Sequence, residues 1–450
     1  MSNERSGFSS RLGFVLATAG SAVGLGNIWR FPYLAAKYGG GTFLLIYLIL
    51  TLTFGFSLMI TEVALGRKAG TSAIRAFGHF SKKHTFIGYL TTIIPFIIFP
   101  YYCVIGGWVT KYALLSIQGG IHNAASDTFF TGFISKSAEP MICVLVFLIA
   151  TTVVVGGVKG GVERVSTIMM PVLIVLLIGV SLFCITRPGA MAGVVYYLKP
   201  NLKGFSPTTI LAALGQLFYS MSLAMGIMIT FGSYMPKKAD LEKSVTQVEI
   251  FDTGVAFLAG LMIVPAVFAF SNGDSSMLAK GPSLMFVMLP KVFDSMAFSG
   301  VIAAVFFILV LLAALTSSIS LLETLVAVLM DKFHMKRGTA CITMFIIALL
   351  LAVPSSLGFG AWSNITILGF DFLDFFDFIS NSVLMPIAAF LTCLFVGYII
   401  KPKVIVDEVE SSGEFKRKSL FLIMVKYIAP ICIVAILVFS VLEGLGFITV

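Results

Sequence analysis

Charged side chains are scarce in this sequence. Asp, Glu, Lys and Arg make up 11% of its 450 residues, whereas a soluble domain usually carries about 25%. Apolar residues make up 58%, and the mean hydropathy is +1.03. So little charge excludes an ordinary soluble protein of this length and predicts a chain that lies in a lipid bilayer.

Histidine and cysteine are also rare. The four histidines fall in or near the stretches between apolar runs, without an HExxH or Ser-His arrangement inside a run, so nothing indicates an enzyme active site. The six cysteines lie inside apolar runs without a CxxC pair, which is typical of small buried residues rather than a disulfide framework. The N-terminal stretch has no signal-peptide cleavage site, and no repeated sequence resembles a channel filter.

Long apolar runs are abundant instead. A helical run of about 18 residues or more can cross a hydrocarbon core of about 30 Å. We count eleven runs, at roughly 11–36, 42–66, 86–117, 139–156, 164–186, 208–234, 242–270, 297–330, 339–357, 375–400 and 420–446. They leave no room for a separate soluble domain. The sequence therefore predicts an all-α polytopic membrane protein with eleven transmembrane helices in one domain over 1–450.

The positive charges predict how the chain crosses the membrane. Twenty of the thirty Lys and Arg lie on one side if the N-terminus is cytoplasmic, and seven lie in the opposite loops. Cytoplasmic loops carry the excess of Lys and Arg, so we expect a cytoplasmic N-terminus and an external C-terminus. The formal charge of +9 then reflects topology and contact with anionic lipid. The basic residues are spread over six short segments, which argues against nucleic-acid binding.

Two runs are crowded with helix breakers near their centres. Residues 20–27 in the first run and 219–226 in the sixth are rich in Gly, Ser and Asn. Gly costs about 1 kcal/mol relative to Ala in a helix, so both stretches predict local unwinding, with close helix packing as the alternative. The runs are five apart, as the first helices of two inverted five-helix repeats would be. We predict repeats over 1–186 and 204–400 and an extra helix over 419–450.

Motifs in order along the chain resemble the neurotransmitter:sodium symporter family. Residues 11–13 (RLG), 22–32 (AVGLGNIWRFP) and 39–41 (GGG) are similar to the opening of that family. The resemblance continues at Glu62, 65–67, 101–102, 215–220, 315–318 and Asp377. It implies a 5+5 inverted repeat with broken helices 1 and 6, an architecture for which this family is a standard example.

The resemblance also implies a function. Eleven helices and short termini are similar to the small bacterial members that carry hydrophobic amino acids. We therefore expect sodium-coupled symport of a hydrophobic or aromatic L-amino acid into the cell by alternating access, in a bacterial inner membrane. A sodium-dependent sensor that binds an amino acid without transport is the alternative. The expected partners are the amino acid and the lipid bilayer, and the protein would be a monomer or a weak homodimer.

By the same resemblance, two sodium ions act as cofactors. The first site would use the Ala22 carbonyl with Asn27, Ser220 and Asp252. The second site would use backbone carbonyls and hydroxyls, which belong to Gly20, Val23, Ala313, Thr316 and Ser317. Unwound backbone offers the hard oxygen ligands that sodium prefers. On their own, the hydroxyls near 316–318 are equally typical of helix packing and backbone capping.

Asp252 departs from the commonest family pattern, which has Asn at this position. A lone carboxylate inside a membrane costs at least about 2.5–3.5 kcal/mol on insertion scales, so Asp252 is a functional candidate. In chloride-dependent relatives an anion balances the sodium charge, and we expect Asp252 to supply that charge permanently. Transport would then need no chloride, and protonation of Asp252 on sodium release would permit proton antiport. A carboxylate that is merely paired within the bundle is the alternative.

The substrate pocket is expected between the two breaks, and Ala22 would line it as well as bind sodium. Freed N–H groups at Leu25 and Gly26, with the Tyr102 hydroxyl, would bind a carboxylate. Family members that carry monoamines have an acidic residue where this chain has Gly24, which argues for a substrate with its own carboxylate. Carbonyls near Ser220 and Ser222 would accept the ammonium group. The wall for the substrate side chain would comprise Ile98, Tyr102, Tyr219, Ser222, Met225, Ser317 and Leu321, and Met adapts to several shapes.

Charged residues flank this pocket on both sides. By resemblance, Arg30 and Asp377 would pair above it to close the outer path. Arg5 and Asp331, supported by Tyr234, would close the inner path, with ordinary interfacial charge as the alternative. Exposed ion pairs contribute only about 0–1 kcal/mol, which suits a gate that must open.

Gly161 and Pro171 form a further feature of the fifth run. Pro removes a helical hydrogen bond and Gly bends easily, so the inner end of this run could unwind and let water reach the second sodium ion. A fixed kink is the equally favoured alternative.

Overall fold

The computed structural model describes residues 7–201, 205–271 and 282–447, and the chain there is built from helices. Nine helical stretches in these ranges are long and apolar enough to span a membrane, and one bent pair of helices adds a tenth span. The prediction of an all-helical membrane protein is confirmed. The count of eleven stays a prediction, because the sixth run is divided into two shorter helices.

Short turns labelled η interrupt the spanning stretches: η3 is a tight 3₁₀ turn, and the others are wider turns. The nine spanning stretches follow in chain order. They are Gly41–Ala69 (α3 Gly41–Leu50, η2 Thr51–Gly55, α4 Phe56–Ala69), Lys82–Ile117 (η3 Lys82–His84, α6 Thr85–Ile117), α9 Ala138–Val155, Val158–Ile185 (η4 Val158–Glu163, α10 Arg164–Ile185), α14 Leu241–Phe270, α16 Ser299–Phe333, α17 Arg337–Leu357, Phe372–Ile399 (α18 Phe372–Asp377, η8 Phe378–Leu384, α19 Met385–Leu394, η9 Phe395–Ile399) and Lys418–Gly444 (α21 Lys418–Ile423, η10 Met424–Ile428, α22 Ala429–Gly444).

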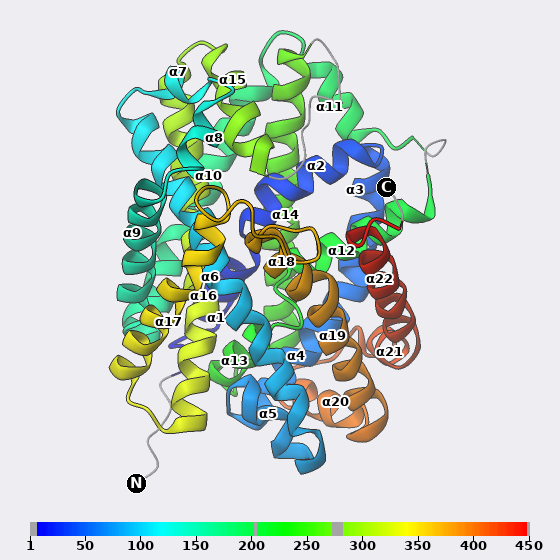
Figure 1. Cartoon of the computed structure of the whole chain (residues 1–450). Coiled ribbons are helices and arrows are strands. Elements are labelled where there is room, and N and C mark those ends of the chain that lie inside the picture. Colours follow the sequence, from blue (N-terminus) through cyan, green and yellow to red (C-terminus); the bar gives the residue numbers. More distant parts are fainter. Residues whose placement is uncertain (1–6, 202–204, 272–281, 448–450) are drawn as a thin grey trace.

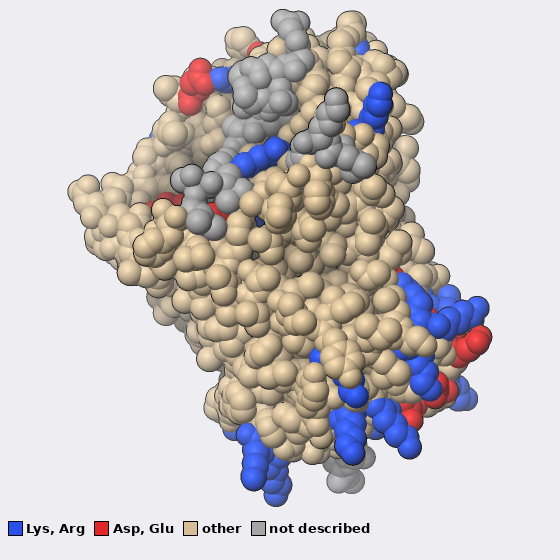
Figure 2. Space-filling view, turned by 90° about the vertical axis from the view of Figure 1, so that its right-hand side faces the viewer, with Lys and Arg blue, Asp and Glu red and all other residues tan. Residues whose placement is uncertain are grey.

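Short helices connect these spans at the two ends of the bundle. They are α5 Ala73–Phe80, α7 Ile121–Ala124, α8 Phe129–Ile134, α11 Ala190–Leu198, η7 Leu284–Met288, α15 Leu289–Asp294 and α20 Lys403–Glu410. Figure 1 places α7, α8, α11 and α15 at one end and α5 and α20 at the other. On the face drawn in Figure 2, Lys and Arg gather mainly at the end that carries α5 and α20, and a broad band without charge lies between the ends.

The first apolar run is broken near its middle. Helix α1 (Arg11–Ala22) ends at Val23, whose backbone is extended (φ −73°, ψ 99°). Helical structure resumes in η1 (Gly26–Arg30) and α2 (Phe31–Lys37), and the two halves are bent by 55°. Residues Gly13–Ala22 are all buried, and α1 packs against α10, α14 and α16. The break therefore lies inside the protein, where unwound backbone is tolerated in a membrane.

The sixth run is broken more severely. Helix α12 (Pro207–Ser220) and α13 (Ile227–Tyr234) are separated by six residues without regular helix. Two of them, Ser222 (φ 52°) and Ala224 (φ 62°), have left-handed backbone, as has Gly226 (φ 70°). Such angles are uncommon for residues with a side chain and persist only where the surrounding structure holds them. The broken ends of the two runs thus face each other in the interior.

Candidate functional site

A pocket lies between the two breaks. Its volume is about 30 Å³, which is small beside the roughly 300–1,000 Å³ of ordinary small-molecule sites, so its walls lie close together. Its walls come from the first run, α6, the sixth run and α16. The lining residues are Ser21, Ala22, Gly24, Leu25, Gly26, Asn27, Ile98, Tyr102, Tyr219, Ser220, Ser222, Met225, Ile227, Ser317 and Leu321. All twelve residues that the sequence indicates for substrate binding are among them.

Two lining residues, Ser21 and Ile227, were missed by the sequence analysis. The Ser21 hydroxyl donates to Ser222 Oγ (3.3 Å), and Ser222 donates in turn to the Ser21 carbonyl (3.0 Å). Ile227 begins α13, two residues after Met225. Ser21 stands between Gly20 and Ala22, which were predicted as sodium ligands. Its position in the stretch predicted to unwind could have indicated that it lines the pocket. No comparable signal pointed to Ile227, because an apolar residue at a helix start is typical of the core.

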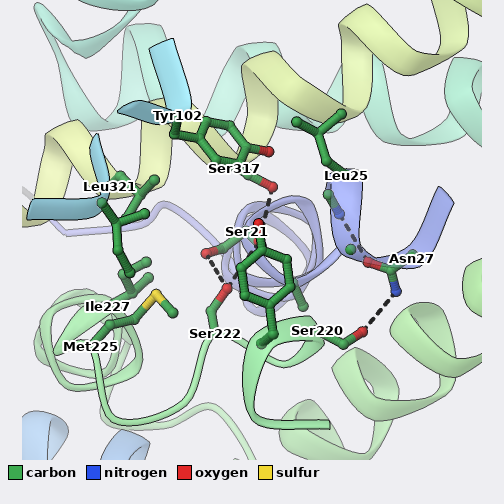
Figure 3. Close-up of a pocket in the computed structure, with 15 residues that line it drawn as sticks. Ser21, Leu25, Asn27, Tyr102, Ser220, Ser222, Met225, Ile227, Ser317 and Leu321 are labelled. Atoms are coloured by element: carbon green, nitrogen blue, oxygen red, sulfur yellow. Dashed lines mark hydrogen bonds between the residues drawn. The ribbon is translucent and has the colours of Figure 1, made fainter. Parts of the chain in front are cut away.

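The pocket is polar at one end and apolar at the other. Figure 3 shows Leu25, Asn27 and Ser220 on one side and Leu321, Ile227 and Met225 on the opposite side. Such a division suits a molecule with a charged head and an apolar side chain.

Tyr102 is the clearest polar group without a partner. Its side chain is buried, and its hydroxyl lies close to the Ser317 hydroxyl and the Leu25 N–H without making a well-formed hydrogen bond to any described residue. A buried hydroxyl left unpaired costs about 1–3 kcal/mol, so its presence calls for a bound polar group. The hydroxyl would lie 3.3 Å from a Cβ added at Gly24. It is therefore close to the backbone freed by the first break.

Gly24 is packed so closely that a side chain at this position would collide with its neighbours. A Cβ at this position would lie 2.6 Å from Ser317 Oγ, a separation at which something must shift. The Gly24 N–H donates to Asn27 Oδ1 (3.0 Å), which ties the break to η1. An acidic side chain at this position is incompatible with this packing.

One carboxylate, that of Asp252, meets three neutral side chains beside the pocket. Asp252, on α14, is fully buried and accepts hydrogen bonds from Asn27 Nδ2 (2.7 Å), Ser220 Oγ (2.9 Å) and, more weakly, Tyr47 Oη (3.4 Å). None of these donors is charged. A buried carboxylate whose side-chain partners are all neutral fits a cation. Of the residues indicated for the first sodium site, Asn27, Ser220 and Asp252 are thus in direct contact, and the Ala22 residue lines the adjoining pocket.

A second group of oxygen atoms gathers where α16 passes the first break. Ser317 Oγ lies 3.4 Å from the Gly20 carbonyl and 3.2 Å from the Val23 carbonyl. Thr316 Oγ1 donates to the Ala313 carbonyl (3.0 Å), and a Cβ at Gly20 would lie 3.2 Å from Thr316 Cβ. All five residues indicated for the second sodium site therefore lie together. The set consists of hydroxyl and carbonyl oxygens, the donors that sodium favours.

The outer charged residues are arranged differently from the expected pair. Asp377 accepts hydrogen bonds from Tyr101 Oη (3.0 Å) and Asn381 Nδ2 (2.6 Å), whereas the Arg30 guanidinium lies 5.3 Å from the centre of the Tyr219 ring. The two residues make no direct contact among the described interactions, although Asp377 lies within electrostatic range of Arg30. The partners of Asp377 lie on α6 and η8, and that of Arg30 lies on α12. An ion pair between Arg30 and Asp377 therefore stays a prediction.

At the inner end, Arg5 lies outside the described residues. Asp331 accepts a hydrogen bond from the Ser72 N–H (2.7 Å). Tyr234 donates to Glu323 (2.7 Å), which also pairs with Arg337. Tyr234 therefore contacts the buried carboxylate of Glu323 on α16. Sequence reasoning missed Glu323, because one Glu in a long apolar run does not reveal its partners.

The two residues of the proposed hinge are both in helical structure. Gly161 lies in η4, and Pro171 lies inside α10. A Cβ at Gly161 would be 1.8 Å from the Val154 carbonyl, so only Gly permits this approach between the ends of α9 and η4. The inner end of this span is folded here, and η4 is its wider, less regular turn.

Comparison with known proteins assigns the class. The sequence pattern of the Sodium:neurotransmitter symporter family matches residues 5–131 and 130–445, and the chain belongs to this family of sodium-dependent transporters, which are not enzymes. It is 35% identical over 438 residues to the uncharacterized sodium-dependent transporter YhdH of Bacillus subtilis, which covers 95% of this chain and 96% of that protein.

More distant relatives and a solved structure agree. The human sodium- and chloride-dependent GABA transporter 2 is 28% identical over 382 residues, covering 73% of this chain and 62% of that protein. The crystal structure of MhsT in complex with L-phenylalanine matches with a TM-score of 0.87 and 38% identity, covering 97% of this chain and 100% of MhsT. The family resemblance stated from the motifs is confirmed.

Proposed function

We propose that this protein carries a hydrophobic or aromatic L-amino acid into the cell together with sodium. The observation that carries the proposal is the unpaired Tyr102 hydroxyl in a pocket whose far end is formed by Ile98, Met225 and Leu321. The hydroxyl and the freed N–H groups near Leu25 suit a carboxylate. The apolar end suits a side chain such as that of phenylalanine, the ligand of MhsT in its crystal structure.

Sodium would occupy two sites. The first is formed by Ala22, Asn27, Ser220 and Asp252, and the second by Gly20, Val23, Ala313, Thr316 and Ser317. The neutral surroundings of the buried Asp252 carboxylate support the first site and a transport cycle without chloride. The Asn27 side chain joins the first site to the N–H of Gly24 in the pocket, so binding of ion and amino acid would be coupled by direct contact.

Transport would proceed by alternating access. Outward binding is followed by closure through Tyr219 and Arg30, and release follows opening of the inner gate (Arg5, Asp331, Tyr234) and unwinding near Gly161. Two sodium ions, driven by about 100 mV and a tenfold gradient, could sustain roughly 10⁵-fold accumulation of a zwitterion. The gathering of Lys and Arg at one end supports a cytoplasmic position for that end in a bacterial inner membrane. The two breaks, five spans apart, support an inverted repeat.

Binding measurements test the substrate and the ion together. The purified protein is heated with each of the twenty amino acids, and with phenethylamine, in sodium or in potassium. Hydrophobic and aromatic amino acids are expected to raise the melting temperature in sodium only, because they fill both ends of the pocket. Stabilisation by the amine that lacks a carboxylate, or equal stabilisation in potassium, would contradict the proposal.

A further inference from the structure

Arg417 reaches into the bundle from the segment between α20 and α21. Its Nη1 and Nη2 atoms each donate to Glu249 Oε2 at 3.1 Å, and its Nη2 also donates to Thr246. The guanidinium carbon lies 3.3 Å from the centre of the Phe56 ring. The Arg417 side chain is 24% exposed, whereas that of Glu249 is 2% exposed. A cation from a connecting segment thus neutralises a carboxylate that is almost fully buried.

Glu249 is three residues before Asp252 on α14. Side chains at this spacing lie on the same face of a helix, with Cβ atoms about 5–6 Å apart. The second oxygen of Glu249, Oε1, is buried and has no hydrogen-bond partner among the described residues. Arg417 also pairs with Glu242, about two turns before Glu249 on α14, through a contact of 3.6 Å between Nε and Oε1. Arg417 is therefore shared between Glu242 and Glu249, whereas the side-chain partners of Asp252 are neutral.

A cavity lies on the other side of Arg417. Its walls include Arg417, Thr246 and Glu242, but neither Glu249 nor Asp252. Glu242 accepts hydrogen bonds from the backbone N–H groups of Lys416 and Arg417 and also pairs with the Arg417 guanidinium (3.6 Å), so it fixes both the backbone and the side chain of Arg417. Arg417 therefore stands between the cavity and Glu249, and its charge is held in place by the fold.

We propose that the Arg417–Glu249 ion pair sets the sodium affinity of the site at Asp252. Arg417 offsets the charge of Glu249, whereas Asp252 has only neutral side-chain partners and keeps its negative charge for one cation. Charges a few ångströms apart in a buried site interact strongly because solvent screens them little. The inference rests on the proposed function, because it assumes that sodium binds at Asp252, and it assigns the pair to regulation of that site's affinity.

Single and double substitutions test the charge balance. Glu249→Gln removes the carboxylate that Arg417 contacts nearest to Asp252 and leaves Glu242 as its other acidic partner. More of the positive charge then acts on Asp252, so the sodium concentration for half-maximal effect is expected to rise roughly tenfold. Arg417→Gln removes positive charge. The sodium concentration for half-maximal effect should therefore stay equal or fall in this variant. The double variant restores the balance and should return to within about threefold of the unsubstituted protein. Sodium binding is measured as the sodium-dependent rise in melting temperature without amino acid.

A merely structural ion pair predicts a different pattern. Both single substitutions would then weaken sodium binding, and the double variant would bind sodium no better than either. That pattern would overturn the proposal. Unchanged sodium affinity in Glu249→Gln would overturn it as well. If Glu249→Gln does not fold, Arg417→Gln is compared with Arg417→Lys, which keeps the positive charge. Weaker sodium binding by Arg417→Gln than by Arg417→Lys would overturn the proposal.

An exposed ion pair in the same segment provides the matched control. Glu410 and Lys418 are 2.8 Å apart and each is 43% exposed. Glu410→Gln and Lys418→Gln make the same charge changes in screened positions and should alter sodium affinity by less than about twofold. Absence of any sodium effect on the unsubstituted protein would refute the proposed function itself. A sodium effect that is present but insensitive to Glu249→Gln would refute only the inference about the pair.

Discussion

The guanidinium of Arg30 lies 5.3 Å from the centre of the Tyr219 ring. The same ring also lies against the first break, since a Cβ added at Gly26 would lie 2.5 Å from Tyr219 Cδ1. The Tyr219 ring therefore contacts both Arg30 and the backbone that borders the pocket. Asp377 lies within electrostatic range of Arg30 but makes no direct contact with it among the described interactions.

Arg30→Ala should therefore speed the loss of bound amino acid to the outside. A cation over an aromatic ring contributes about 0.5–2 kcal/mol, so dissociation is expected to be about two- to thirtyfold faster. The measurement is the dissociation rate of a labelled amino acid from protein held in sodium. Tyr219→Phe keeps the ring and is the control. An unchanged rate in Arg30→Ala would show that this contact does not hold the path closed.

Tyr102→Phe should separate affinity from stability. The substitution removes a hydroxyl that has no described partner without ligand, so the melting temperature of the free protein should stay equal or rise slightly. Affinity for the amino acid should fall about tenfold or more, because a hydrogen bond to a charged group is lost. Titration of both proteins with phenylalanine in sodium gives the two affinities. Equal affinities would mean that the carboxylate lies elsewhere.

Gly24→Ala should weaken binding of the amino acid without preventing folding. The added methyl would lie 2.6 Å from Ser317 Oγ and 3.3 Å from Tyr102 Oη, where it displaces groups of the site. We expect a loss of affinity of at least about tenfold, since overpacking costs roughly 1–3 kcal/mol. Gly338→Ala adds the same methyl in α17, where nothing lies within 4 Å, and should bind normally. Full affinity in Gly24→Ala would rule out the pocket as described.

Asp252→Asn should make transport depend on chloride. The substitution removes the buried negative charge while keeping the shape of the side chain, so an anion would be needed to balance sodium. Uptake by the unsubstituted protein is expected to be unchanged when gluconate replaces chloride. Uptake by Asp252→Asn should be low in gluconate and partly restored by chloride. Chloride dependence of the unsubstituted protein would contradict this role of Asp252.

Neighbouring glycines in η4 provide a test of the hinge. A Cβ at Gly161 would lie 1.8 Å from the Val154 carbonyl, whereas a Cβ at Gly160 meets nothing within 4 Å. Gly161→Ala should therefore unfold the inner end of this span and increase labelling of a Cys at Ser317 by a membrane-permeant thiol reagent in an otherwise cysteine-free protein. Gly160→Ala should label like the parent. Equal labelling of the two variants would favour the fixed kink.

The membrane spans could be predicted closely because hydropathy reports directly on the bilayer. The run predicted at 242–270 is α14, Leu241–Phe270. The sixth run could not be predicted in detail. Its break includes Ser222 and Ala224 with positive φ, although Ala is the best helix former, so the tertiary structure overrides local preference there.

The site shows the same limit. Motif resemblance selected residues that the fold brings together around one pocket, because each belongs to a break or to the helix beside it. It did not select the partners of individual charges. Arg30 lies over Tyr219, Tyr234 donates to Glu323, and Arg417 pairs with Glu249 from far away in the chain. Such pairs depend on side-chain packing between distant helices, which one sequence does not reveal.

The most direct test of the account is concentrative uptake of labelled phenylalanine into proteoliposomes that contain only this protein. An inward sodium gradient should drive internal phenylalanine above the external concentration, and potassium in place of sodium should abolish the accumulation. Gramicidin, which dissipates the sodium gradient, should release what has accumulated. Binding that needs sodium without accumulation would contradict the symporter and favour a sensor, and accumulation in potassium alone would contradict sodium coupling.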